Sequence, residues 1–191
     1  MSAGLPCTAF SSSTIFFSFS VRVLARGEKW AFSSASKHVQ QLIEENHLRW
    51  DSLGEFMAIA VSLEDVGFKH HNKKAMILGK TLDEATGNLL DNSKNPSPKT
   101  GQLDNRGSHS YLSLYWAQAL AAQTEDAELK AYFSPLAKTL AENEKKIVDE
   151  LNAVQGKPAD IGGYYVAVPS KAGAVMRPSA TFNAVIDPLA A

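Results

Sequence analysis

The chain has 191 residues, of which 45% are hydrophobic, 20% charged and 9% aromatic. This composition is close to that of average soluble globular proteins, and it excludes a wholly disordered, collagen-like or disulfide-stapled chain. Nineteen lysines and arginines against 20 aspartates and glutamates give a net charge of −1, so no global field attracts nucleic acid or an anionic membrane. The single cysteine, Cys7, fits a reducing compartment. No apolar run reaches the roughly 18 residues that a membrane span needs.

Residues 1–32 form an atypical N-terminal stretch. The first acidic residue is Glu28, and the segment before it carries Arg22, Arg26 and six serines. A segment rich in serine and arginine but poor in acid is typical of an organelle transit peptide, which predicts a mitochondrial or plastid location. A non-native start of the sequence is the alternative, and composition does not separate the two. In both cases we expect the folded part to span residues 33–191.

The first half of that part predicts three helices. Ser36 is a good N-cap residue, so a first helix is expected after it, running to about Asn46. A second helix is expected from Ser52, because residues 52–55 (Ser-Leu-Gly-Glu) match the capping-box pattern. The break between the two predicts that the chain folds back at the connector of residues 47–51. A third helix is expected from about 73 to 88.

The second half predicts two more helices and irregular segments. A loop with many turn-forming residues covers 91–101, and a fourth helix is expected to follow with Ser108 as its N-cap. A fifth helical segment from Asp126 to about Val154 is expected to be interrupted at Pro135. Residues 161–166 read as extended and residues 176–179 as a turn or loop. No alternation of strands and helices is present, so a complete Rossmann unit is not encoded.

The common catalytic signatures are absent, including the P-loop, G-x-G-x-x-G, H-E-x-x-H, C-x-x-C and G-x-S-x-G patterns. His70, His71 and His109 could be imagined as a metal site. Adjacent histidines point to different sides of a helix or strand, and this pair lies among lysines and asparagines. A solvated turn is therefore the preferred interpretation of His70 and His71.

A second polar set could bind an anion. On one unbroken helix, His38 and Arg49 would stand about 16 Å apart along the axis, too far to hold one group. Folding back at the connector would place Arg49 beside the start of the second helix, and Arg106 precedes the expected N-cap at Ser108. Helix N-termini with neighbouring arginines bind phosphate. The alternative is that Arg49 pairs with Asp51, and Arg106 with Asp104, as ordinary surface ion pairs.

Several longer strings carry a resemblance. Lys37 to Gln41, Leu48 to Phe56 and Asp104-Asn105-Arg106-Gly107-Ser108-His109 resemble the monomeric-type NADP-dependent isocitrate dehydrogenases. The same holds for further strings in the right order, at residues 115–120, 136–144, 152–158, 160–165 and 176–183.

The resemblance implies that residues 33–191 are the C-terminal part of the cofactor-binding domain of such an enzyme. The implied fold is a mainly α fragment of an α/β isocitrate/isopropylmalate-dehydrogenase-like fold. The implied activity is the oxidative decarboxylation of isocitrate to 2-oxoglutarate in the tricarboxylic acid cycle, with NADP and Mg²⁺ or Mn²⁺. Members of the family are typically monomeric and cytoplasmic, and they act on small molecules rather than on nucleic acid or membranes.

The resemblance also implies site residues. His38, Arg49 and Arg106 match positions that hold the adenosine 2′-phosphate of NADP, and Ser34 and Asp51 match further cofactor contacts. The family's catalytic residues and metal ligands lie upstream, so this chain is expected to contain none and to be inactive alone. The alternative is a non-catalytic helical module that at most binds NADP or a partner chain.

Two departures from the family pattern bear on that site. Ser33 stands where glycine is usual, and Ser36 where proline is common. The extra side-chain atoms of Ser33 are expected to weaken cofactor binding, because the backbone there has to approach the cofactor closely.

Overall fold

A computed structural model describes residues 32–190, and the surroundings of the side chains from residue 37 to 189. The N-terminal stretch and its interpretation as a transit peptide lie outside the described residues. No β-strand occurs between residues 32 and 190, which confirms the prediction of a mainly helical chain. The elements are α2 (Phe32–Glu45), α3 (Leu53–Lys69), α4 (Lys73–Asp91), α5 (Asn105–Ala122), α6 (Ala127–Ala153), α7 (Pro169–Met176), α8 (Ala180–Ile186) and the 3₁₀ helix η1 (Asp187–Ala190).

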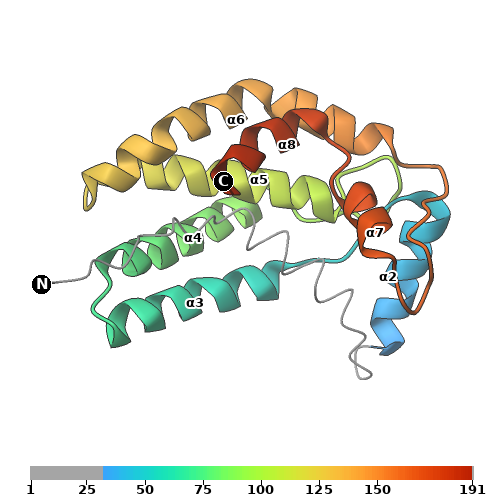
Figure 1. Ribbon diagram of the computed structural model, residues 1–191, viewed down its shortest axis with the longest axis horizontal. Coiled ribbons are helices and arrows are strands. Elements are labelled where there is room, and N and C mark those ends of the chain that lie inside the picture. Colours follow the sequence, from blue (N-terminus) through green and yellow to red (C-terminus); the bar gives the residue numbers. More distant parts are fainter. Residues whose placement is uncertain (1–31, 191) are drawn as a thin grey trace, which may run out of the picture.

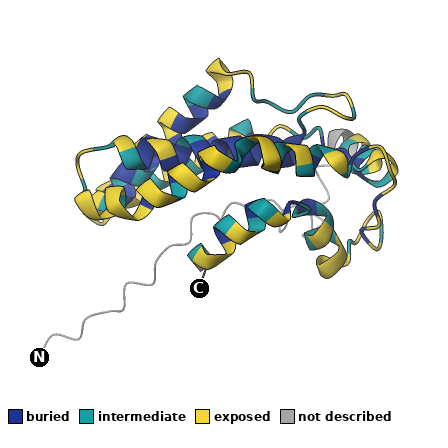
Figure 2. Ribbon diagram, turned by 90° about the horizontal axis from the view of Figure 1, so that it is seen from above, coloured by how far each residue is buried: buried dark blue, intermediate teal, exposed yellow. Residues whose placement is uncertain are grey.

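Four long helices form the body of the structure. Helix α3 packs on α4, α4 on α5 and α5 on α6, while α8 lies against α6 (Figure 1). Their inward-facing residues are buried and their outer faces exposed, as the dark blue and yellow of Figure 2 show. Helices α2 and α7 and the loop before α5 gather at one end of the body, on the right in Figure 1.

Two helix starts differ from the sequence prediction. Helix α2 begins at Phe32, so Ser36 lies inside it rather than at its N-cap. Helix α5 begins at Asn105, because Asp104 rather than Ser108 is its N-cap: Asp104 Oδ1 accepts from the backbone N–H groups of Arg106 (3.0 Å) and Gly107 (3.3 Å). A carboxylate is as good an N-cap as a serine hydroxyl, and it precedes Ser108 in the chain.

Helix α6 is continuous through Pro135, although the sequence predicted an interruption there. Proline removes the N–H that would bond the carbonyl of Ala131, one turn earlier. Both residues are exposed, so water reaches that carbonyl, and the helix continues. The stop at Gly156 is as predicted, with a positive φ of 79° that glycine adopts without strain.

The C-terminal helices were not predicted from sequence. Residues 161–166 form bends rather than a strand, and α7 follows with Pro169 at its first position. Helix α8 is capped by Ser179, whose hydroxyl oxygen accepts from the backbone N–H of Phe182 at 3.0 Å. These helices have eight and seven residues, too few for a helical repeat of apolar residues to stand out.

The α3–α4 packing depends on a glycine. A Cβ atom added at Gly79 would lie 2.8 Å from the carbonyl oxygen of Ala60 in α3, closer than real contacts allow. We therefore expect Gly79→Ala to lower the free energy of unfolding by about 1–3 kcal/mol, because a backbone atom cannot move aside cheaply. Gly87→Ala, in the same helix with open space around it, should instead be neutral or stabilising by up to about 1 kcal/mol. Urea unfolding of both variants measures the contrast.

Candidate functional site

The connector between α2 and α3 is held against the start of α5. Helix α2 ends where Asn46 adopts a left-handed backbone conformation, with φ of 48°. The backbone N–H of Asn105 then donates to the carbonyl of Leu48 at 2.7 Å. The Asn105 side-chain amide donates to the carbonyl of Trp50 (2.9 Å) and to Ser52 Oγ (3.0 Å). The chain thus folds back at the connector, as the sequence predicted.

The predicted capping box at the start of α3 does not form. Ser52 is the N-cap residue, as predicted, but its Oγ accepts from Asn105 and makes no capping hydrogen bond to its own helix. Asp51 Oδ1 accepts from the backbone N–H of Leu53 at 3.0 Å instead, and the other oxygen of Asp51 accepts from the Asn95 side chain at 3.0 Å. Glu55 accepts from the indole N–H of Trp50 at 3.1 Å. The helix start was predicted correctly, but different side chains hold it.

His38 and Arg49 meet across the fold-back. The Nε–H of Arg49 donates to Nδ1 of His38 at 3.1 Å, although the residues belong to different segments. The His38 ring also lies edge-on to Trp50, with ring centroids 5.5 Å apart. Between residues 37 and 189, the two terminal guanidinium nitrogens of Arg49 have no hydrogen-bond or carboxylate partner. Within that range, a cation with four N–H groups that have no partner therefore lies beside a histidine, as an anion site requires.

The protonation of His38 follows from the same contacts. Partial burial, and then the positive charge of Arg49, lower the pKa of His38 below its ordinary value. Nδ1 accepts a hydrogen bond, so neutral His38 carries its proton on Nε2, which remains able to donate. A dianion beside this ring would favour the charged imidazolium and raise its pKa. Nδ1 then donates as well, so the hydrogen bond from Arg49 is given up and its Nε–H also becomes available to the anion.

Arg106 is placed differently. It is 1% exposed, and its guanidinium pairs with Asp104 at 2.6 Å, inside the protein. Its guanidinium donates four hydrogen bonds, to Asp104, to the side chain and the carbonyl of Asn46, and to the carbonyl of Val175. The structure thus does not bring Arg106 together with His38 and Arg49, and its donors are not open to a phosphate.

Of the two surface ion pairs left open from sequence, the Arg106–Asp104 pair forms but is buried. Arg49 and Asp51 do not pair among the described residues.

Within the described surroundings of residues 37–189, none of the other predicted residues forms a hydrogen bond or ion pair with His38 or Arg49. Ser34 lies in the first turns of α2, and its side chain falls outside the described surroundings, as do those of Ser33 and Ser36. Asp51 is exposed near Arg49 in the chain. His70 and His71 are exposed at the far end of α3, whereas His109 is buried against Phe56 near its start, so the three do not converge. No group of three or more His, Cys, Asp or Glu side chains in the described part of the chain could hold a metal ion.

Sequence reasoning missed a buried histidine that holds the loop between α4 and α5, residues 92–104, against the connector. His47 is fully buried, and its ring nitrogens face Gln155 Oε1 (2.8 Å) and the carbonyl of Ser97 (2.7 Å). The same loop touches α2 where the Gln41 amide donates to the carbonyl of Pro98 at 3.2 Å. Gln155 is 108 residues away from His47, so no local pattern could have indicated the contact.

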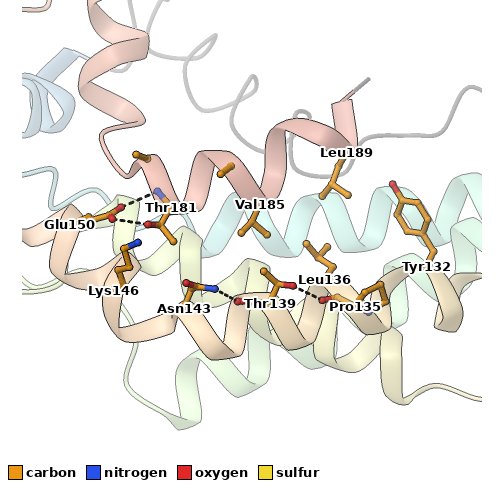
Figure 3. Close-up of a pocket in the computed structure, with 12 residues that line it drawn as sticks. Tyr132, Pro135, Leu136, Thr139, Asn143, Lys146, Glu150, Thr181, Val185 and Leu189 are labelled. Atoms are coloured by element: carbon orange, nitrogen blue, oxygen red, sulfur yellow. Dashed lines mark hydrogen bonds between the residues drawn. The ribbon is translucent and has the colours of Figure 1, made fainter.

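A groove of about 770 Å³ lies elsewhere, between α6 and α8 (Figure 3). It contains none of the predicted site residues. At one end Glu150 accepts from the hydroxyls of Thr181 and Ser179, both at 2.7 Å, and these hydrogen bonds lower the pKa of Glu150. They tie the start of α8 to α6, which is a structural role.

Comparison with known proteins identifies the family. A sequence model described as monomeric isocitrate dehydrogenase matches residues 20–187. The chain belongs to the monomeric isocitrate dehydrogenase family. The matched region starts within the stretch of residues 1–32 that composition set apart.

Curated relatives agree with this family. The chain is 61% identical over 163 residues to an isocitrate dehydrogenase [NADP] of Azotobacter vinelandii. It is 60% identical over 160 residues to isocitrate dehydrogenase [NADP] 2 of Mycobacterium tuberculosis. Each alignment covers about 85% of this chain but 22% of the relative, so the chain spans roughly a fifth of the length of these relatives. These relatives are bacterial and lend no support to an organelle transit peptide. None of the described helices is long and apolar enough to cross a membrane.

Proposed function

We propose that this chain supplies the part of a monomeric-type isocitrate dehydrogenase that binds the 2′-phosphate of NADP. The observation that carries the proposal is the His38–Arg49 contact, with the terminal guanidinium nitrogens of Arg49 unpaired in the described region. A 2′-phosphate is a dianion that NAD lacks, so a cation beside a histidine discriminates between the two cofactors. Asp51 and Ser34 are proposed as further cofactor contacts, and the compartment is proposed to be the cytoplasm.

The proposed reaction of the whole enzyme is the oxidation of isocitrate at its hydroxyl carbon, with transfer of a hydride to NADP and loss of CO₂ to leave 2-oxoglutarate. None of the residues described in this chain is assigned to the reacting atoms. The divalent metal that the family implies, Mg²⁺ or Mn²⁺, finds no fitting ligand group among them. We assign this chain the recognition of the adenosine end of the cofactor, and we expect the purified chain to produce no NADPH from isocitrate.

The proposal is tested with two probes that differ in the 2′-phosphate, adenosine 2′,5′-bisphosphate and 5′-AMP. Arg49→Ala should weaken binding of the bisphosphate by about 10- to 150-fold, the loss of one charge-assisted hydrogen bond, and leave 5′-AMP unchanged. Isothermal titration calorimetry of the 191-residue chain measures both. Lys145→Met, at an exposed lysine of α6, is the control for a general loss of positive charge. Equal losses for both probes would contradict the proposal.

The pH dependence of bisphosphate binding tests the role of His38 independently. Its pKa is lowered in the free chain and should rise when a dianion binds, so binding takes up a proton. Affinity for the bisphosphate should therefore increase as the pH falls through the titration of this ring. His38→Leu should remove that part of the dependence and leave only the titration of the phosphate itself. A wild-type profile identical to that of His38→Leu would show that the ring does not face the phosphate.

A further inference from the structure

Helix α3 carries large apolar side chains on two sides. On its inner side Phe56 and Ala60 are 1% and 2% exposed, within the main core. On its outer side Met57, Val61 and Phe68 are 52%, 65% and 76% exposed. A helix with one such face is ordinary for a surface position, whereas a helix apolar on two sides is typical of one enclosed between two layers.

The three exposed residues form one stripe. At 100° per residue, positions 57, 61 and 68 lie within about 40° of one another around the helix axis, and they span most of its length. Asp65 and Lys69 flank the stripe on one side and pair with each other at 2.7 Å. Glu64 lies at its other edge, toward α4, where it is half-buried beside Gly79. We call Met57, Val61 and Phe68 the outer stripe of α3.

No described helix covers the outer stripe. Helix α3 stands at the edge of the helical body, and of the described elements only α4 packs extensively on it (Figure 1). The glycines at the α3–α4 contact, Gly67 and Gly79, bring α4 against a neighbouring side of α3, the one that carries Ala60 and Gly67, and leave the outer stripe uncovered. Contiguous exposed apolar surface on a helix marks a contact with another part of a protein or with a partner.

The length of the relatives indicates what covers it. Enzymes 60–61% identical to this chain contain nearly four-fifths of their length outside the aligned region. We propose that the outer stripe of α3 is the surface on which the part of the family fold outside this chain packs. The inference deepens the proposed function, because it requires that this chain works as one part of a larger isocitrate dehydrogenase. The expected partner surface is apolar and uncharged where it meets Val61 and Phe68.

The test uses a full-length chimera, in which this chain replaces the matching 163 residues of the Azotobacter vinelandii enzyme. Val61→Glu with Phe68→Glu should lower the melting temperature of the chimera by about 5–10 °C, because two charges are then buried without partners. Ser62→Glu is the matched control, since it adds a charge at an exposed position of the same helix outside the stripe. It should shift the melting temperature by no more than about 2 °C.

The isolated 191-residue chain supplies the second arm. There the double substitution should leave the urea midpoint unchanged and lower the fluorescence of a hydrophobic dye, because the stripe is exposed. A chimera whose melting temperature is insensitive to the double substitution would overturn the proposal. So would a dimer of the isolated chain that the substitution dissociates while the chimera stays unaffected, since a second copy would then be the occupant. If the chimera does not unfold cooperatively, the isolated chain decides: dye fluorescence that the double substitution leaves unchanged would overturn the proposal.

These results are separable from those on the cofactor site. The double substitution should leave binding of adenosine 2′,5′-bisphosphate to the isolated chain unchanged, because the stripe contains neither His38 nor Arg49. A chain that fails to bind the bisphosphate would refute the proposed phosphate site and leave the outcome at the stripe intact.

Discussion

Arg106→Met is expected to lower the free energy of unfolding by about 3–5 kcal/mol, since it breaks a buried ion pair on one side only. The substitution leaves the Asp104 carboxylate, which is fully buried, without its cation. It also removes the donors to Asn46 and Val175, which connect the start of α5 to α2 and α7. Urea unfolding followed by circular dichroism measures the loss.

Two further variants separate the causes of that loss. Combining Arg106→Met with Asp104→Asn removes the buried negative charge and keeps an N-cap residue, so much of the stability should return. Lys145→Met breaks an exposed ion pair with Asp149 and should change stability by less than about 1 kcal/mol. An Arg106→Met variant as stable as Lys145→Met would mean that the buried pair does not hold the helices together.

His47→Leu is expected to lower the free energy of unfolding by about 1–3 kcal/mol. Gln155 Oε1 accepts from the backbone N–H of Gly101 (2.7 Å), and the Gln155 amide nitrogen donates to the carbonyl of Gln102 (3.0 Å), which fixes the orientation of that amide. Both ring nitrogens of His47 therefore face acceptors, Gln155 Oε1 and the carbonyl of Ser97. Leucine would leave the carbonyl of Ser97 without its ring partner and Gln155 Oε1 with only the N–H of Gly101, at about 1–3 kcal/mol for the unmade hydrogen bond.

The same substitution should loosen one loop selectively. The backbone amide of Gly101 should exchange faster with deuterium in His47→Leu, whereas amides in the middle of α4 should change only as far as global stability does. His70→Leu, at an exposed histidine, is the matched control and should leave the exchange rates of the Gly101 amide and of the α4 amides unchanged. Equal acceleration of exchange in the loop and in α4 would show that His47 stabilises the whole fold rather than this loop.

What the sequence could predict follows from how local each signal is. The starts of α3 and α4 and the fold-back at the connector were correct, because turn and cap residues next to each helix determine them. Ser52 is the N-cap residue of α3 as predicted, but its hydroxyl accepts from Asn105, 53 residues away, instead of capping the helix, which no local pattern indicates. The interior position of Arg106 likewise depends on Val175 in α7, 69 residues further on.

In the candidate site, too, the contacts set by neighbouring segments were predictable, and those set by distant residues were not. His38 and Arg49 come together because a short connector joins their two segments, which the sequence shows. Arg106 looks the same in sequence, a positively charged residue before a helix, yet its donors are used inside the protein. Only the three-dimensional contacts distinguish an arginine with open donors from one whose guanidinium is buried and bonded inside the protein.

The central proposal is that this chain carries the preference for NADP over NAD. The most direct measurement is the ratio of the dissociation constants for NADP and NAD in the full-length chimera, with and without Arg49→Ala. We expect Arg49→Ala to weaken the binding of NADP by about 10- to 150-fold and to leave the dissociation constant for NAD unchanged. The preference for NADP then falls by the same factor. Equal losses for both cofactors, or none, would contradict the proposal.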